Sequence, residues 1–161
     1  MADPITQTYR DVEVTLREDE NTWSFTVNGR QRSAPTLPKA REYIDNALDE
    51  VKAGKVKAWE PFMAWTDHGF GGLRKVKVTS QAERSYSNPE FWTVDQDAKD
   101  HRGRTKPERK KISINWLYED TDANAERVRQ IEDYNKRVAA LNDEQEKVKG
   151  ALTKMPIPSS D

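Results

Sequence analysis

The chain has 161 residues, of which 34% are hydrophobic and 34% are charged, and its formal net charge is −1. The apolar fraction lies below the ~45–50% usual for globular domains, which predicts a small core and a partly extended chain. The lack of cysteine excludes a disulfide framework, a cysteine nucleophile and a zinc site with cysteine ligands. The N-terminus lacks the features of a secretory signal, and no apolar run approaches the ~18 residues of a membrane span, so we expect a soluble cytoplasmic protein.

Residues 9–54 predict a small antiparallel sheet packed by one helix. Apolar and polar residues alternate at 12–16 and again at 23–27, as they do in half-buried strands. Asn28-Gly29 follows the second strand, and this pair is a strong hairpin signal because both turn residues adopt positive φ. The polar segment 30–33 would then form a third strand at the edge of the sheet.

A helix is predicted to follow these strands. Thr36 can cap it, because a threonine hydroxyl accepts from the free N–H groups of a first helical turn, and Pro38 is tolerated there. Gly54 stands where a glycine in the left-handed conformation ends a helix. The apolar residues of this segment recur at helical spacing on one face, and they are Ala40, Ile44, Ala47, Leu48 and Val51.

Residues 55–74 form a connector that is rich in aromatic residues and glycine. A solvated linker would not carry two Trp and two Phe, so we expect the connector to pack against a neighbouring module. Two interpretations stay open: the rings close the core, or they are binding hot spots for a protein partner. The candidate protein-interface residues are Trp59, Phe62, Trp65 and Phe70.

Residues 75–118 predict a second small β-module. Alternation at 75–80, the run 91–94 and the alternating apolar residues at 112–116 indicate three strands. A long charged loop, 99–111, separates the last two strands. Three strands in so short a segment suggest a meander or a partial barrel.

The 99–111 loop is the clearest charged feature of the chain. Residues 61–111 hold eleven basic and seven acidic side chains, whereas the segments on either side are net acidic. The loop either neutralises phosphates, with Phe91 and Trp92 as a stacking surface, or is a solvated loop that charge keeps soluble. The candidate nucleic-acid residues are Arg102, Arg104, Lys106, Arg109, Lys110 and Lys111.

Residues 121–154 predict a long helix, and 155–161 form a polar tail. Apolar residues step by three and four along the helix, as in the a and d positions of a coiled coil. Either this seam joins two copies of the chain, as in a homodimer, or it packs on the chain's own strands. The candidate oligomerisation residues are Ile131, Tyr134, Val138, Leu141, Gln145, Val148 and Leu152.

Catalytic and metal-binding motifs are weak in this sequence. No Gly-x-Ser-x-Gly is present, and the two histidines, His68 and His101, are far apart in the chain. We therefore expect a protein that is not an enzyme and that has no metal site or cofactor.

The first module resembles the sheet-plus-helix module of AP2 domains and tyrosine-integrase arm-binding domains. The resemblance rests on Tyr9-Arg10-x-Val12, on the segment from Trp23 to Arg30, and on the segment 40–47. In that family the sheet enters the DNA major groove. The resemblance implies DNA contacts by Arg10, Trp23, Arg30 and Arg32.

The whole layout is similar to that of short accessory proteins of bacteriophages and mobile elements. The sequence thus predicts an α+β protein with a small N-terminal antiparallel sheet and helix, a second β-module and a long C-terminal coiled-coil-like helix. Its predicted function is non-enzymatic binding of a protein partner, and the resemblance extends this to inhibition of a host defence protein. Nucleic-acid binding through the basic loop and the N-terminal sheet is the alternative.

Overall fold

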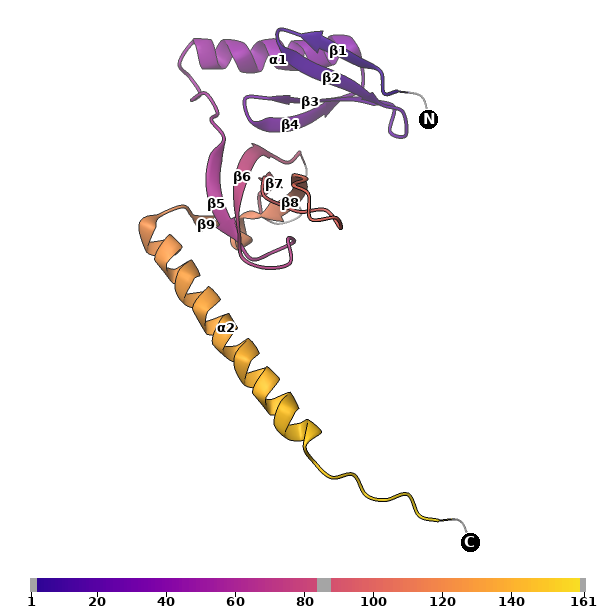
Figure 1. Cartoon of the computed structure of the whole chain (residues 1–161). Coiled ribbons are helices and arrows are strands. Elements are labelled where there is room, and N and C mark those ends of the chain that lie inside the picture. The colour runs from indigo at the N-terminus through magenta and orange to yellow at the C-terminus, as the bar shows by residue number, and fades with distance from the viewer. Residues whose placement is uncertain (1–2, 84–87, 160–161) are drawn as a thin grey trace. The chain divides into compact units, whose positions relative to one another are not determined.

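The structure is a computed structural model that describes residues 3–83 and 88–159. The chain forms two compact units, Met1–Asp120 and Thr121–Asp161. The first unit is built on a mixed β-sheet with one helix, and the second is a long helix followed by a short tail (Figure 1). The predicted α+β class is confirmed.

The N-terminal half of the first unit is an antiparallel meander followed by a helix. Its turn at Asn28 and Gly29 has φ angles of 47° and 71°, so the predicted hairpin is confirmed. The sequence did not predict the first strand, which pairs with the second along its whole length. The elements are β1 (Thr6–Tyr9), β2 (Val12–Arg17), β3 (Thr22–Val27), β4 (Arg30–Ala34) and α1 (Leu37–Lys52).

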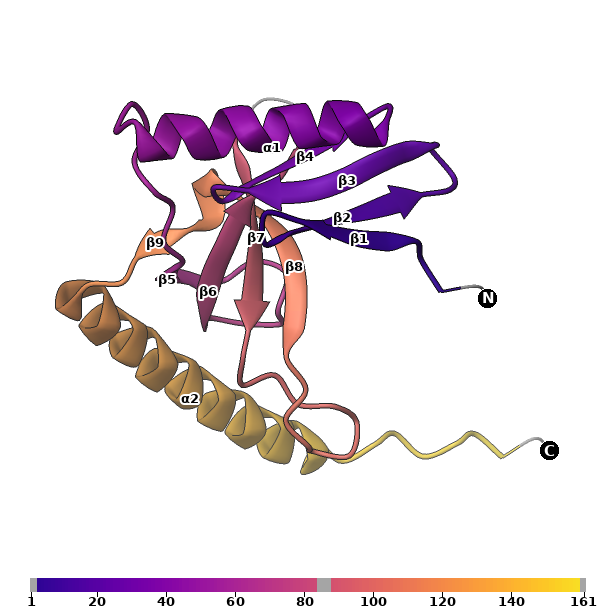
Figure 2. The ribbon, with the colours of Figure 1, turned by 90° about the horizontal axis from the view of Figure 1, so that it is seen from above.

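Helix α1 lies across these strands and covers one face of their sheet (Figure 2). Thr36 caps it as predicted, since its hydroxyl accepts from the N–H of Lys39 at 3.3 Å. Gly54, with φ of 73°, follows the last turn, and its N–H donates to the carbonyl of Val51. The fully or nearly buried core of this half comprises Val14, Phe25, Val27, Ala34, Ala40 and Ile44.

The C-terminal half of the unit is a second set of strands. β6 is central and pairs antiparallel with β5 and with β7, while β8 lies beyond β7 and β9 beyond β5. Its small buried cluster consists of Phe70, Val76 and Ile112, with Leu117 packed against it. The strands are β5 (Phe62–Thr66), β6 (Arg74–Gln81), β7 (Glu90–Asp95), β8 (Glu108–Ser113) and β9 (Tyr118–Glu119).

Three details of the sequence prediction are wrong. The 55–74 connector contains β5, whose run Phe-Met-Ala-Trp-Thr lacks the alternation that marks a half-buried strand. The expected strand at 112–116 ends at Ser113, whose hydroxyl accepts from Asn115 N–H and begins the 3₁₀ turn η1 (Ile114–Trp116). The expected edge strand is internal, because β4 also pairs with β6 through Arg30 and Gln81.

The Trp59 side chain holds the two halves of the unit together. Its backbone N–H donates to Oδ1 of Asn28 at 2.7 Å, and its indole N–H donates to the carbonyl of Thr79 at 3.0 Å. The ring covers Gly29 so closely that a Cβ at this position would lie 2.0 Å from it. Glycine at 29 is thus required both by its positive φ and by the ring above it.

The second unit is the helix α2 (Asp122–Gly150). Thr121 caps it, because its hydroxyl accepts from Asn124 N–H at 3.1 Å. The predicted long helix is therefore present and begins at the start of the predicted range. It ends a few residues earlier than the predicted range 121–154.

Candidate interaction surfaces

The four candidate aromatic residues of the connector have different environments. Phe70 is buried in the small core, and Trp59 is half-buried between the two halves of the unit. Trp65 is half-buried on β5, with Lys75 Nζ at 5.8 Å from its ring centroid. Phe62 alone is exposed, at 47%. The structure thus places two of the four rings in packing roles and leaves Phe62 accessible.

Phe62 lines an apolar groove of about 430 Å³, called here the η1 groove. Ile114 and Tyr118 stand at the same groove with 46% and 43% of their surface exposed. The sequence had predicted Ile114 as part of a strand, and it did not single out Tyr118. The lining residues are Phe62, Met63, Ala64, Phe91, Ile114, Leu117, Tyr118, Glu119 and Asp120.

A stack of rings supports one wall of this groove. The Trp59 ring lies 5.8 Å from that of Phe62 and 6.4 Å from that of Phe91, and it is stacked on the latter at 16°. Trp59 is held by the hydrogen bonds of its backbone N–H to Asn28 and of its indole N–H to Thr79. The neighbouring rings of Phe62 and Phe91 therefore pack against a fixed side chain. A pre-formed apolar groove loses less conformational freedom on binding than a mobile one.

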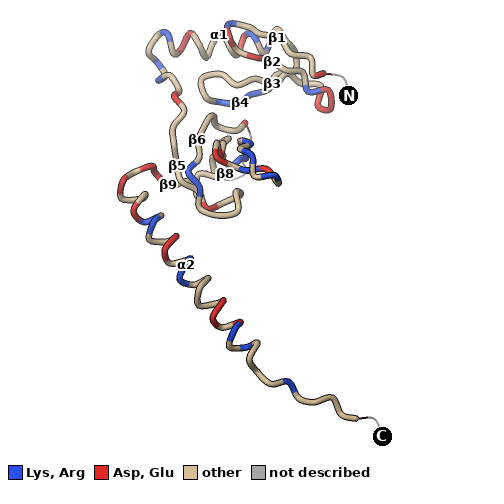
Figure 3. Tube along the Cα trace, viewed as in Figure 1, with Lys and Arg blue, Asp and Glu red and all other residues tan. Residues whose placement is uncertain are grey.

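The predicted basic loop is divided between a loop and a strand (Figure 3). Arg102, Arg104 and Lys106 lie in the loop and are exposed. Arg104 pairs with Asp100 at 3.3 Å, while Arg102 and Lys106 form no ion pair with any residue in the described part of the chain. The loop thus presents three exposed cations, one of which is paired with an acidic neighbour.

The other three candidates belong to β8, where successive side chains point to opposite faces. Lys110 lies on the face of the buried core, and its ammonium group donates to the carbonyl of Gly69. Arg109 and Lys111 lie on the opposite face. The guanidinium of Arg109 stacks 4.0 Å above the ring of Trp92. The six candidate cations therefore do not form one patch.

The AP2-like resemblance implied four DNA contacts, which the structure does not bring onto one exposed face. Trp23 packs against the core under α1. Arg30 and Arg32 lie opposite Val27 and Phe25 and so share the face on which α1 packs, although both arginines are exposed. The fourth residue, Arg10, is engaged by α1.

Arg10 forms a small polar network with Tyr9 and Asp45. Its Nη1 donates to Oδ1 of Asp45 at 2.8 Å, and the Tyr9 hydroxyl donates to Oδ2 at 2.9 Å. These two hydrogen bonds, that of Arg10 first, hold the pKa of Asp45 below its usual value. The network ties the β1–β2 turn to α1.

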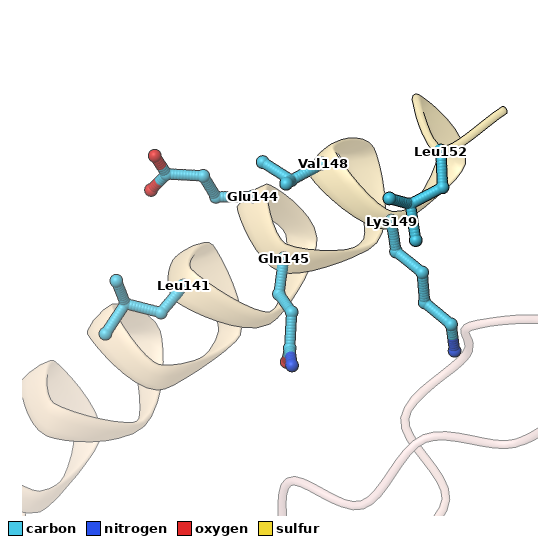
Figure 4. Close-up of a pocket in the computed structure, with 6 residues that line it drawn as sticks. All are labelled: Leu141, Glu144, Gln145, Val148, Lys149 and Leu152. Carbon is cyan, nitrogen blue, oxygen red and sulfur yellow. The ribbon is translucent and has the colours of Figure 1, made fainter.

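Six of the seven candidate oligomerisation residues lie along α2, and Leu152 lies two residues beyond the end of the helix. Leu141, Val148 and Leu152 are 64%, 67% and 71% exposed. Together with Gln145, they line a shallow groove along the helix, flanked by Glu144 and Lys149 (Figure 4). The predicted apolar seam is thus exposed along its C-terminal part.

Within the described residues, no group of three or more His, Asp or Glu side chains could hold a metal ion. His68 instead stacks on Trp116, with ring centroids 5.2 Å apart. None of the helices formed by these residues has the length and apolar character needed to cross a membrane. No family model, no curated protein and no solved structure matches this chain.

Proposed function

We propose that this chain is a non-enzymatic interaction protein that binds a protein partner in the η1 groove. The observation that carries the proposal is the exposure of Phe62, Ile114 and Tyr118 around one apolar groove. Aromatic and large aliphatic anchors that enter well-formed pockets dominate the energetics of protein interfaces. The similarity of the layout to bacteriophage accessory proteins extends the proposal to a host protein as the partner, including a defence protein that the binding inhibits.

Site-specific photocrosslinking in cells of the source organism tests this proposal. A photoreactive phenylalanine analogue replaces Phe62 in the groove in one variant and Tyr43 of α1 in a control. Tyr43 is a suitable control because it is an exposed aromatic residue on a different element. We expect a crosslinked partner from position 62 alone, and its loss when Ile114→Asp is added. Equal crosslinking from both positions, or crosslinking that survives Ile114→Asp, overturns the groove as the site.

We also infer that α2 joins two copies of the chain. The lining residues of the α2 groove form two sets of four with the spacing i, i+3, i+4 and i+7. The first set is Leu141, Glu144, Gln145 and Val148, and the second is Gln145, Val148, Lys149 and Leu152. Four residues of this spacing form the hole that accepts one side chain of the facing helix in a coiled coil. The groove on α2 consists of two such adjacent holes.

The flanking charges suit a parallel pair of helices. In the heptad, Gln145 occupies an a position and Val148 a d position. Glu144 directly precedes Gln145 and therefore occupies a g position, and Lys149 directly follows Val148 and therefore occupies an e position. In a parallel dimer each Glu144 would face the Lys149 of the second copy. Gln145, the single polar residue at an a position, would then face the Gln145 of the second copy. Polar residues paired in this way at a positions set the register of a coiled coil.

Light scattering coupled to gel filtration tests the association. We expect a dimer mass for the natural chain and a monomer mass for Leu141→Asp with Val148→Asp. Ala139→Asp with Ala140→Asp makes the same charge change off the seam and should stay dimeric. Because the chain has no cysteine, Gln145→Cys should form a disulfide only where two a positions meet in parallel. A monomeric natural chain overturns the association, and a dimer without the disulfide overturns only the parallel arrangement.

A further inference from the structure

The face of the C-terminal half that lies opposite the buried core carries an ordered set of aromatic and basic side chains. On the core side, Val76, Val78, Thr93 and Ile112 are fully or almost fully buried. Their neighbours along each strand point the other way. Trp65, Lys75, Lys77, Trp92, Val94, Arg109 and Lys111 on that other face, called here the open face, are exposed or half-buried, while Ser80, which lies opposite Trp92 beyond a bulge in β6, is buried.

The strand register arranges the open face in rows, because residues directly opposite each other on paired strands share a face. The first row crosses three strands: Trp65 lies opposite Tyr118 on one side and Lys75 on the other. The last row places Trp92 opposite Lys111. Each of these rows combines an aromatic ring with a cation.

The middle row of the open face contains two cations, Lys77 and Arg109, that form no ion pair among the described residues. Lys77 lies opposite Val94, which in turn lies opposite Arg109. The cations of the outer rows form ion pairs. Nζ of Lys75 lies 3.1 Å from Oδ1 of Asp120, and Nζ of Lys111 lies 3.5 Å from Oε2 of Glu90. The unpaired positive charge is therefore concentrated at the centre of the open face.

We propose that the open face binds single-stranded nucleic acid. Exposed aromatic rings on a sheet stack unpaired bases, and neighbouring cations neutralise the phosphates between them. The planar guanidinium of Arg109, already stacked on Trp92, offers a base a further flat surface with hydrogen-bond donors at its edge. A duplex would hide its bases from these rings, so the face suits a single strand.

This site differs from the basic loop that the sequence singled out. Arg102 and Lys106 of the loop are exposed cations that contact no ring in the described part of the chain, whereas Arg109 on the strand stacks on Trp92. The charged centre of the open face lies outside the η1 groove, because Lys77 and Arg109 do not line it, whereas Tyr118 borders both sites. Charge alone would favour both regions equally, whereas stacking favours the open face.

Fluorescence anisotropy with the full chain tests the proposal. The probes are labelled DNA and RNA single strands of about 12 nucleotides, within the site sizes of small domains, and a DNA duplex of the same sequence. We expect single strands to bind more tightly than the duplex and binding to weaken steeply with added salt. The two single strands distinguish DNA from RNA as the ligand.

Two matched variants locate the site. Lys77→Glu with Arg109→Glu reverses two charges on the open face, and Arg102→Glu with Lys106→Glu reverses two in the loop. We expect the first to weaken binding at least tenfold and the second to change it much less. Tyr118→Ala, which leaves every charge in place, should weaken binding about fivefold or more through lost stacking. Thermal unfolding followed by circular dichroism verifies that each variant folds. If Lys77→Glu with Arg109→Glu does not fold, Lys77→Ala with Arg109→Ala takes its place.

Three results overturn the proposal. The first is an absence of binding to either single strand at low salt. The second is an equal loss in the open-face and loop variants, which indicates attraction by net charge only. The third is tighter binding of the duplex than of the single strands.

Discussion

The two halves of the first unit cover their sheet in different ways. In the N-terminal half a single helix, α1, covers the strands, and six buried residues form one cluster with it. In the C-terminal half, no helix formed by the described residues of the unit plays this part, and a loop residue, Phe70, packs with the buried strand residues Val76 and Ile112 instead. The half without a covering helix also carries the η1 groove and the open face. Incomplete covering of a sheet thus leaves side chains available for binding.

Truncating one isoleucine in each core should give the largest effect and separate the two halves. Ile44→Ala removes a fully buried side chain beneath α1, and Ile112→Ala removes one at the C-terminal cluster. Such substitutions cost about 2–5 kcal/mol of unfolding free energy, depending on how far the site collapses. We expect Ile44→Ala near the upper end and Ile112→Ala near the lower end, because a loop relaxes more easily than a helix. Urea denaturation measures both, and equal losses contradict this contrast.

A substitution at the joint between the halves should have an intermediate effect. Gly29→Ala adds a Cβ that would lie 2.0 Å from the Trp59 ring, at a φ of 71°. Gly103→Ala is the matched control, because Gly103 has a φ of 74° and nothing within 4 Å of an added Cβ. The left-handed backbone costs each variant about 1–2 kcal/mol. We expect a larger loss for Gly29→Ala, with a shifted tryptophan emission spectrum. Equal losses would mean that Trp59 moves aside freely.

The smallest effect concerns the polar network of the N-terminal half. The pKa of Asp45 is lower in the folded chain, so its interactions stabilise the fold above the unfolded pKa of about 3.9 and are lost as the pH falls through the folded value. Asp45→Asn should therefore lower the melting temperature near neutral pH, and the difference from the natural chain should shrink below about pH 4. A difference that stays constant down to about pH 2 contradicts this account.

The two halves also differed in how well the sequence predicted them. In the N-terminal half, local signals decide the structure: the Asn28-Gly29 turn, the Thr36 cap and the apolar face of α1 all agree. The sequence missed β1, whose residues Thr-Gln-Thr-Tyr show no apolar alternation, and the pairing of β4 with β6. Elements with strong local patterns were thus predictable.

The C-terminal half depends on pairings between distant residues. β5 is stabilised by its two neighbours, β6 and β9, and nothing in its own apolar run indicates a strand rather than a packed connector. The η1 groove forms because Ser113 ends β8 and turns Ile114 outward. The open face depends on the register of four strand pairs, which a one-residue shift would reverse. None of these features is readable from one segment alone.

The joint between the halves has a mechanical consequence. Among the described residues, β4 and β6 pair only through Arg30 and Gln81, next to the bond from Gln81 N–H to the carbonyl of Gly29. A pulling force that separates the halves loads this short contact, the Trp59 anchor and the hydrogen bonds that join Trp92 to Gln31 and Ser33 to Glu83. Each meander instead shares the load over several paired residues. The unit should therefore yield first at the joint, with both halves still folded, and extend in two steps rather than one.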